Sequence, residues 1–175
     1  MTSQLVSENG LRCCSYNMHG FANGLPMLHS LCSNHDLILL QEHWLHTYEF
    51  HLLSDMFTDF NSYSISAMND KLAAGLFLGR PFGGVAIMWR KNLNVTMKMT
   101  ESDDGGRYLA ILLNINQKMY LIHCVYFPCM TNKVDYVVET TNLIEKLELN
   151  LCNYPAVNHI LAGDFNFELR QDTTY

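Results

Sequence analysis

Four short apolar segments that each end in polar side chains constrain the fold of this chain most strongly. Their length and composition are typical of buried β-strands. In sheets whose faces are covered by helices, ligands bind beside the C-terminal ends of the strands. Four such ends therefore predict one shared site. The segments are Arg12–Asn17, Leu37–Glu42, Tyr120–Tyr126 and Ile160–Asn166.

The last of these segments ends in an acid and an amide, Asp164 and Asn166. In an extended chain, residues two positions apart point to the same face. A carboxylate can orient or deprotonate a water molecule, and an amide can donate to a phosphoryl oxygen. We expect Gly163 to let the backbone approach a ligand closely. The alternative is a strand that ends in an Asx turn.

Five segments of the chain resemble the endonuclease/exonuclease/phosphatase superfamily. Within that superfamily they are most similar to the apurinic-type endonuclease domain of non-LTR retrotransposons. The resemblance runs from about Leu11 to Asn166 and implies Mg²⁺-dependent cleavage of a phosphodiester, with Mn²⁺ as an alternative metal. The segments are Ser15–Gly20, Gln41–Trp44, Gly79–Ile87, Val125–Pro128 and Gly163–Asn166.

The resemblance also implies a role for each residue at the strand ends. Glu42 is expected to bind the metal, and Asn17 to position the metal site. Tyr126 is expected to contact the scissile phosphate. Asp164 is expected to align the attacking water, and Asn166 to stabilise the pentacoordinate phosphorus.

One part of the family pattern is missing from this chain. The family completes its site with a later Asp and a terminal Ser-Asp-His stretch, whereas the sequence stops at Tyr175 with no histidine after His159. We therefore expect a C-terminally truncated copy that lacks the last strands of its second sheet and is inactive by itself. His19 is expected to line the cleft.

Charge and composition limit the other functions that the chain can have. The formal net charge of -6 argues against a generally basic nucleic-acid binder, although it leaves a nuclease with local cations open. Arg80, Arg90, Lys91 and Arg107 are the candidate cations, with a solvated surface role as the favoured alternative for each. The acidic pair Asp103 and Asp104 is expected to be an exposed turn.

Cysteines and histidines give no sign of a zinc site or of secretion. The six cysteines form no CxxC pair, and the N-terminus has no apolar signal region. No apolar stretch is long enough to span a membrane. We expect an intracellular protein, acting in the nucleus if the resemblance holds. His43 and His46 are expected to be packing or surface residues, and His123 to be hydrogen-bonded within a sheet.

The pattern along the chain predicts a leader over residues 1–10 and one α/β domain over 11–175. Expected helices begin near Pro26, cover Thr47–Met56 and follow the apolar spacing from Val134 to Leu151. Further strands are expected at Ser62–Met68, Val85–Trp89 and Tyr108–Ile115, the last forming a hairpin with Met119–Tyr126. The predicted fold is a four-layer α/β sandwich of the DNase I-like type, incomplete at its C-terminal end.

Three functional hypotheses follow from these observations. The first is a retrotransposon-type endonuclease that acts on DNA, with a reverse transcriptase downstream in the full element. The second is a phosphomonoesterase or lipid-headgroup phosphodiesterase of the same superfamily. The third is a catalytically dead remnant. Nothing in the sequence indicates an obligate oligomer.

Overall fold

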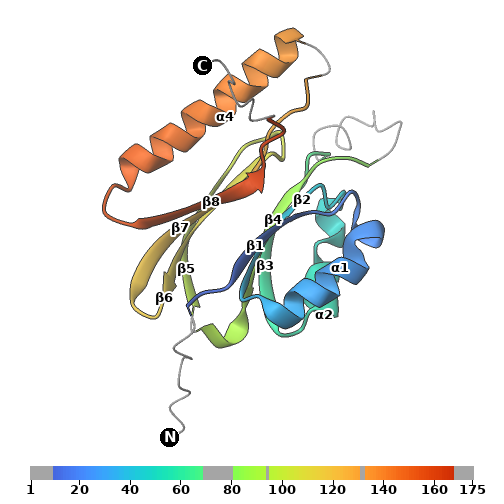
Figure 1. Ribbon diagram of the computed structural model, residues 1–175, viewed down its shortest axis with the longest axis vertical. Coiled ribbons are helices and arrows are strands. Elements are labelled where there is room, and N and C mark those ends of the chain that lie inside the picture. Colours follow the sequence, from blue (N-terminus) through green and yellow to red (C-terminus); the bar gives the residue numbers. More distant parts are fainter. Residues whose placement is uncertain (1–9, 69–80, 94, 131–132, 168–175) are drawn as a thin grey trace, which may run out of the picture.

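Two four-stranded sheets pack face to face in this computed structural model, with helices on the outer face of each sheet (Figure 1). The structure describes residues 10–68, 81–93, 95–130 and 133–167. The predicted four-layer α/β sandwich is confirmed. Its elements are β1 (Cys13–Asn17), α1 (Phe21–Asn34), β2 (Leu37–Gln41), α2 (His51–Met56), β3 (Phe60–Ile65), β4 (Val85–Arg90), β5 (Val95–Ser102), β6 (Tyr108–Ile115), β7 (Lys118–Tyr126), α4 (Lys133–Asn153) and β8 (Asn158–Asp164), with short 3₁₀ turns at Thr47–Glu49 and Lys91–Leu93.

Each sheet carries one parallel strand pair at one of its edges. The first sheet has the order β1-β2-β4-β3, and the second has the order β5-β6-β7-β8. Strands β1 and β2 run parallel, as do β7 and β8, and the other pairs are antiparallel. The β6–β7 hairpin turns at Asn116 and Gln117, which both have positive φ. Positive φ at both central residues is typical of the tight turns that match strand twist.

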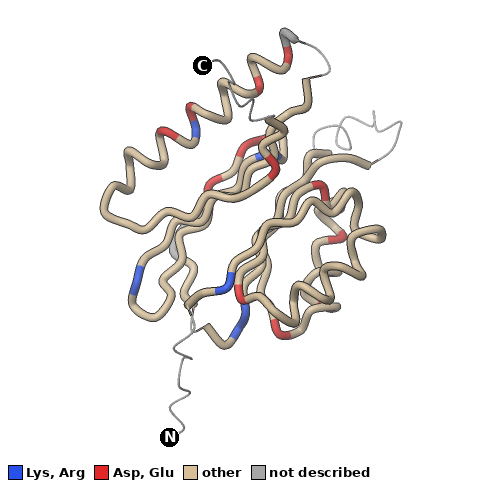
Figure 2. Tube along the Cα trace, in the orientation of Figure 1, with Lys and Arg blue, Asp and Glu red and all other residues tan. Residues whose placement is uncertain are grey.

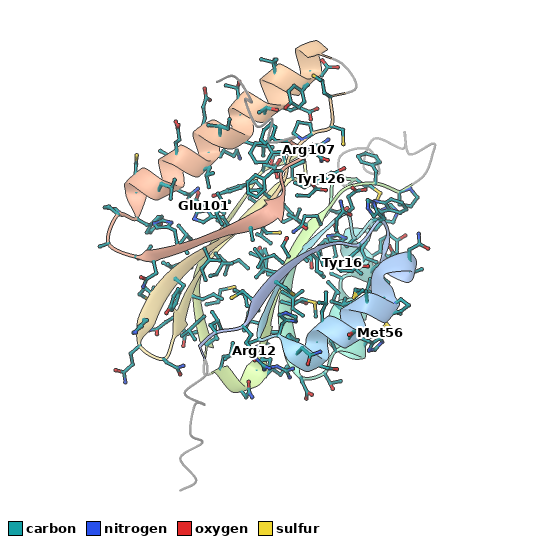
Figure 3. All side chains as sticks on the ribbon, in the orientation of Figure 1. Arg12, Tyr16, Met56, Glu101, Arg107 and Tyr126 are labelled. Carbon is teal, nitrogen blue, oxygen red and sulfur yellow. The ribbon has the colours of Figure 1, made fainter. Side chains whose placement is uncertain are left out.

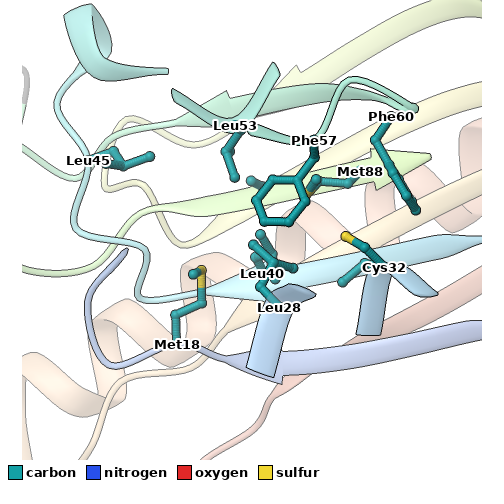
Figure 4. Close-up of a cluster of buried hydrophobic side chains, with 11 residues drawn as sticks. Met18, Leu28, Cys32, Leu40, Leu45, Leu53, Phe57, Phe60 and Met88 are labelled. Atoms are coloured by element: carbon teal, nitrogen blue, oxygen red, sulfur yellow. The ribbon is translucent and has the colours of Figure 1, made fainter. Parts of the chain in front are cut away.

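Three apolar clusters hold the four layers together. The cluster between the two sheets takes alternate side chains from each, such as Leu39 and Ile87 facing Leu109 and Ile122. Helices α1 and α2 cover the outer face of the first sheet, where Leu28 is fully buried (Figure 4). Helix α4 covers the outer face of the second sheet. Alternate burial on both faces explains why these strands read as continuous apolar runs.

Helix α4 contacts its sheet through a different face from the one that the apolar spacing suggests. Leu143 and Asn150 are buried, whereas Val138 and Ile144 are exposed at 54% and 41%. Leu143 packs in the apolar cluster of the second sheet, which includes Tyr108, so this face of the helix is the one that contacts the sheet. The helix is nevertheless the longest in the described part of the chain, as predicted.

Several predicted boundaries are wrong in detail. Helix α1 begins at Phe21, ahead of the expected start near Pro26, so Pro26 lies inside the helix. The helix expected over Thr47–Met56 is divided into a 3₁₀ turn and α2. Strand β3 begins at Phe60 and ends at Ile65. Strand β5 was not predicted, because its residues are mostly polar or methionine.

Two further predictions concern the ends of the chain and membranes. All but the last residue of the predicted leader lies outside the described residues. Among the described helices, none combines the length and the hydropathy that a membrane span requires.

Candidate active site

The four predicted strand ends meet at one edge of the sandwich. Asn17 at the end of β1 pairs in register with Gln41 at the end of β2. Tyr126 at the end of β7 pairs in the same way with Asp164 at the end of β8. The C-terminal ends of two parallel pairs, one from each sheet, therefore face a common space. A cavity of about 620 Å³ lies there, lined by Ser15, Asn17, Gln41, Gly163, Asp164, Phe165, Asn166 and Phe167.

One amide holds two carboxylates at the centre of this site. The Asn17 Nδ2 group donates to Glu42 Oε1 and to Asp164 Oδ2, both at 2.8 Å. The Asn17 oxygen accepts from the backbone N–H of His19 at 3.1 Å, so this orientation of the amide is fixed. Glu42 is largely buried, with 16% of its side chain exposed. Hydrogen bonds that compensate a buried carboxylate keep it oriented at a low cost in stability.

The segment after β8 contains both the acid–amide pair of Asp164 and Asn166 and the Asx turn that was the alternative to it. The Asn166 N–H donates to Asp164 Oδ1 at 3.1 Å, which is an Asx turn. The Asn166 side chain donates through Nδ2 to the Phe127 carbonyl at 2.7 Å. Both carboxylate oxygens of Asp164 therefore have a donor, and both residues line the same cavity. The turn is the means by which the acid and the amide are placed together.

Gly163 makes a close approach of a kind that was not expected. A Cβ at this position would collide with the backbone carbonyl and side chain of Val125 on the neighbouring strand. The glycine thus lets β8 pack tightly against β7, just before the residues that face the cavity. The close approach that the structure shows is to strand β7, and an approach to a ligand stays a prediction.

Tyr126 and Arg107 lie side by side next to the carboxylates (Figure 3). Burial, followed by the hydrogen bond to Glu42 and its negative charge, raises the pKa of Tyr126, so the phenol stays protonated. The Arg107 guanidinium lies 5.0 Å from the centre of the Tyr126 ring and 3.3 Å from Glu139. Its Nη1 is buried and has no hydrogen-bond partner in the described part of the chain.

Backbone strain gathers at this edge of the molecule. Among the described non-glycine residues, six have positive φ, and two of these form the β6–β7 turn. The other four are His19, Glu42, Trp44 and Asn166, with φ of 47°, 52°, 58° and 49°. Such conformations cost roughly 1–3 kcal/mol each and gather at functional sites. The strain is independent support for a site here.

A family model for the Endonuclease/Exonuclease/phosphatase family matches residues 14–175. The chain belongs to this family. A search of curated protein sequences gave no significant match. The fold and the site described above are thus placed in a family of nucleases and phosphatases by a match that covers most of the chain.

Solved structures show the same fold at low sequence identity. The AP endonuclease LMAP from Leishmania major has a TM-score of 0.65 at 16% identity over 94% of this chain and 58% of its own. The human Nocturnin catalytic domain has a TM-score of 0.61 at 17% identity, over 90% and 64%. A 3′ phosphatase from Neisseria, bound to a product DNA hairpin, has a TM-score of 0.61 at 14% identity, over 93% and 60%. The chain therefore spans about three fifths of the length of these proteins.

The remaining predicted residues lie in different places. His19 is at the site but exposed, with Nδ1 3.8 Å from Glu42 Oε1 and 73% of its side chain accessible. Arg80 lies outside the described residues. Arg90 contacts Asp36 at 3.4 Å through Nε, away from the site edge and at the other end of β4. His43 is fully buried: its Nδ1 accepts from the Leu45 N–H, and its Nε2 donates to the Ile65 carbonyl.

Two structural expectations outside the site are confirmed. His123 is buried and hydrogen-bonded to Tyr108 on β6 and His159 on β8. Asp103 accepts the N–H groups of Arg107 and Tyr108, and Asp104 is exposed, so the acidic pair forms a turn.

Three residues that make hydrogen bonds at the site were not predicted individually from the sequence. Ser15 Oγ donates to Gln41 Oε1 at 3.1 Å, and Gln41 Nε2 contacts Cys124 Sγ at 3.2 Å, which links the two sheets beneath the carboxylates. Trp44 Nε1 donates to Glu42 Oε2 at 3.3 Å. The sequence signal that could have identified this network is Gln41, a glutamine in a buried strand immediately before Glu42. A buried amide needs hydrogen-bond partners.

The donor set at this edge fits a hard divalent cation. Among the described residues, no group of three or more His, Cys, Asp or Glu side chains lies close enough to hold a metal on its own. Mg²⁺ usually takes one or two protein carboxylates and fills the other positions with water and substrate phosphate. Glu42, whose side chain is 16% exposed and is held by the Asn17 amide beside the cavity, is a carboxylate of this type.

Proposed function

We propose that this protein hydrolyses phosphodiester bonds in DNA with the help of Mg²⁺, with Mn²⁺ as an alternative metal. The observation that carries the proposal is the Asn17 amide, which holds the carboxylates of Glu42 and Asp164 at 2.8 Å each. Two carboxylates oriented by one amide, with Asp164 lining the cavity, suit a reaction in which one binds a cation and the other activates water.

The metal would be held by Glu42, with Asn17 positioning that carboxylate. When bound, Mg²⁺ supplies charge stabilisation for the phosphoryl oxygens and the leaving oxygen. The Asn17 amide nitrogen faces the two carboxylates in this structure, so we assign it a positioning role. The site chemistry suits an oxygen-preferring cation, because carboxylates, water and phosphate are the groups that Mg²⁺ and Mn²⁺ share as ligands.

Three residues of the chain would act on the phosphate and the water. Asp164 accepts the proton of the attacking water, whose oxygen forms a bond to phosphorus as the bond to the leaving sugar oxygen breaks. Asn166 uses one N–H on Phe127, which leaves its second N–H for a phosphoryl oxygen. Tyr126 keeps its phenolic proton, which is directed at Glu42 in this structure, and would donate it to the scissile phosphate once the substrate is bound.

DNA is the proposed substrate for two reasons. The Neisseria 3′ phosphatase of similar fold was solved with a product DNA hairpin. The Gln41–Trp44 and Gly79–Ile87 segments resemble the retrotransposon endonucleases more than the phosphatases. Lys and Arg are few and scattered over the described chain (Figure 2), so a local cation such as Arg107 would contact the phosphate backbone. A downstream reverse transcriptase and a nuclear site of action stay predictions.

Nicking of supercoiled DNA tests the proposal in the chain with the family's terminal Ser-Asp-His segment added after Tyr175, because the chain by itself is expected to be inactive. Glu42→Gln is expected to abolish Mg²⁺-dependent nicking, because it removes the charge that binds the cation. Asp164→Asn is expected to lower single-turnover cleavage by roughly 10²-fold or more while DNA binding is retained, because a general base is lost. The matched controls are Glu145→Gln on α4 and Asp55→Asn on α2, both exposed and outside the site.

Each alternative has its own outcome in this experiment. Nicking that survives Glu42→Gln would exclude the metal assignment. Release of phosphate from a 3′-phosphorylated oligonucleotide, without nicking, would favour the phosphomonoesterase. A chain with the added segment that folds and cleaves neither substrate would favour the catalytically dead remnant.

A further inference from the structure

We propose that Trp44 is a positioning residue for Glu42 and that Gly20 is the residue that lets it act. This inference rests on the proposed function of Glu42 as the metal-binding carboxylate. Trp44 Nε1 donates to Glu42 Oε2 at 3.3 Å, while Asn17 donates to Glu42 Oε1 at 2.8 Å. Each carboxylate oxygen therefore has its own donor, so the rotation of the carboxylate plane is restricted.

The backbone conformation directs the Trp44 indole toward the carboxylate of Glu42, two residues earlier in the chain. Glu42 and Trp44 both have positive φ, at 52° and 58°. In a regular strand, side chains two residues apart lie parallel and point the same way. That geometry would not direct the Trp44 N–H at the Glu42 carboxylate. Two left-handed residues on either side of His43 bend the segment into the required shape.

Contacts on every side hold this strained segment. The Gly20 N–H donates to the Glu42 carbonyl at 2.8 Å, and the Trp44 N–H donates to the Gly83 carbonyl at 3.0 Å. Between them, the buried His43 ring is bonded at both nitrogens. Strained conformations persist when the surroundings fix them in this way. The side chains of Glu42 and Trp44 thus have a defined relative position.

Gly20 provides the space for the indole. A Cβ on Gly20 would lie 2.5 Å from Trp44 Cε3 and 2.8 Å from Cζ3. Gly20 also has φ of 97°, a conformation that side chains disfavour. The turn between β1 and α1 therefore packs directly on the face of the indole. Both the ring face and the N–H of Trp44 are engaged, the first by Gly20 and the second by Glu42.

A purely structural tryptophan would explain the ring packing but not the hydrogen bond. Trp44 is half-buried, and its N–H is directed at the carboxylate of Glu42. Donors that orient a metal-binding group typically contribute 10–100-fold to metal affinity or activity. The geometry thus separates two contributions of Trp44, packing by the ring and orientation by the N–H, and these can be tested apart.

Trp44→Phe keeps an aromatic ring and removes the N–H. Binding of Mn²⁺ alone, measured from the electron paramagnetic resonance signal of free Mn²⁺, is expected to weaken by roughly tenfold. Trp89→Phe is the matched control, because Trp89 is buried in the cluster between the sheets, and its Mn²⁺ affinity is expected to equal that of the unmodified chain. Thermal unfolding followed by circular dichroism checks that both variants fold.

A second measurement separates positioning from loss of structure. Trp44→Phe is expected to need about ten times more Mg²⁺ for half-maximal nicking and to approach the normal rate at saturating Mg²⁺. A low rate at every Mg²⁺ concentration would overturn the positioning role, because a disturbed fold is not restored by metal.

The two proposals fail in different ways. If Glu42→Gln weakens Mn²⁺ binding and Trp44→Phe does not, the role of Trp44 is wrong and the proposed function stands. If Glu42→Gln itself leaves Mn²⁺ binding unchanged, Glu42 is not the metal-binding carboxylate and both proposals are overturned.

Discussion

At the scale of single residues, the contact between His43 and Gly84 shows how a buried side chain supports the site. The His43 ring lies where a side chain on Gly84 would be, with Cε1 and Nε2 at 2.5 and 2.7 Å from an added Cβ. Gly84 also has φ of 83°. We expect Gly84→Ala to lower the free energy of unfolding by roughly 2–4 kcal/mol, through overpacking and an unfavourable left-handed backbone.

Urea unfolding measures this change, and the chain offers a matched control. Gly10 has nothing within 4 Å of an added Cβ, so Gly10→Ala is expected to change stability by less than about 0.5 kcal/mol. Equal unfolding midpoints for the two variants would contradict the packing described for His43. His43 and His46, which flank Trp44, were expected to be packing or surface residues. The buried His43 ring agrees with a packing role.

At the scale of elements, a chain of hydrogen bonds joins β6, β7 and β8 under helix α4. Tyr108 donates to His123 Nδ1, His123 Nε2 donates to His159 Nδ1, and His159 Nε2 donates to the Tyr154 carbonyl, at 3.0, 3.0 and 2.9 Å. This order requires both histidines to be neutral, since a protonated ring has no acceptor. Burial and, secondarily, His159 lower the pKa of His123 to about 4.

The depressed pKa of His123 predicts acid sensitivity. The unfolded chain has a histidine pKa of about 6.5, so it binds more protons than the folded chain between pH 6.5 and 4. Stability from His123 is therefore complete above pH 6.5 and falls by roughly 1.4 kcal/mol per pH unit toward pH 4. His43, whose pKa burial also lowers to about 4, adds a similar slope.

Unfolding free energies measured from pH 7 to pH 4 test this prediction. His123→Gln is expected to be less stable at pH 7 but to lose stability less steeply as the pH falls. His51→Gln removes an exposed histidine and should leave the slope unchanged. A slope that does not respond to His123→Gln would show that His123 is not held neutral in the folded chain.

The elements also show what the sequence could and could not predict. Strands β2, β6 and β7 could be predicted because they are mostly apolar and are buried on both faces over most of their length. Strand β5 was not, because Thr96 and Met97 give neither alternation nor an apolar run, and its place depends on pairing with β6. The first turn of α1 was not predicted because Gly20, Asn23 and Gly24 at the start of the helix favour turns, yet Gly24 is buried against Met18.

At the scale of the whole molecule, the site residues could be named from the sequence because each ends a recognisable strand. The positions of these residues relative to one another could not be predicted from the sequence. That Asn17 reaches Glu42 and Asp164 together depends on how the two sheets stack, which brings residues 147 positions apart into contact. The hydrogen bond from Trp44 to Glu42 likewise depends on two left-handed residues, which no apolar pattern encodes.

The second sheet ends in β8, whose outer edge pairs with no other described strand. Leu161 on β8 is 41% exposed, and Phe165 and Phe167 follow at 37% and 49%. Strand β8 carries no Lys, Arg, Glu or Pro and has Asp164 only at its end. An apolar edge strand of this kind is a template for pairing with another chain. We therefore expect the chain to self-associate as its concentration rises, and Leu161→Lys to reduce that association by placing a charge on the edge.

Sedimentation velocity across a range of concentrations measures this effect. Val138→Lys on α4 is the matched control, because Val138 is also exposed, at 54%, and lies away from the strand edge. If edge pairing drives association, Leu161→Lys shifts the chain toward monomer and Val138→Lys does not. An equal effect of the two lysines would assign association to general apolar exposure, and a monomer at every concentration would show that the β8 edge is already protected.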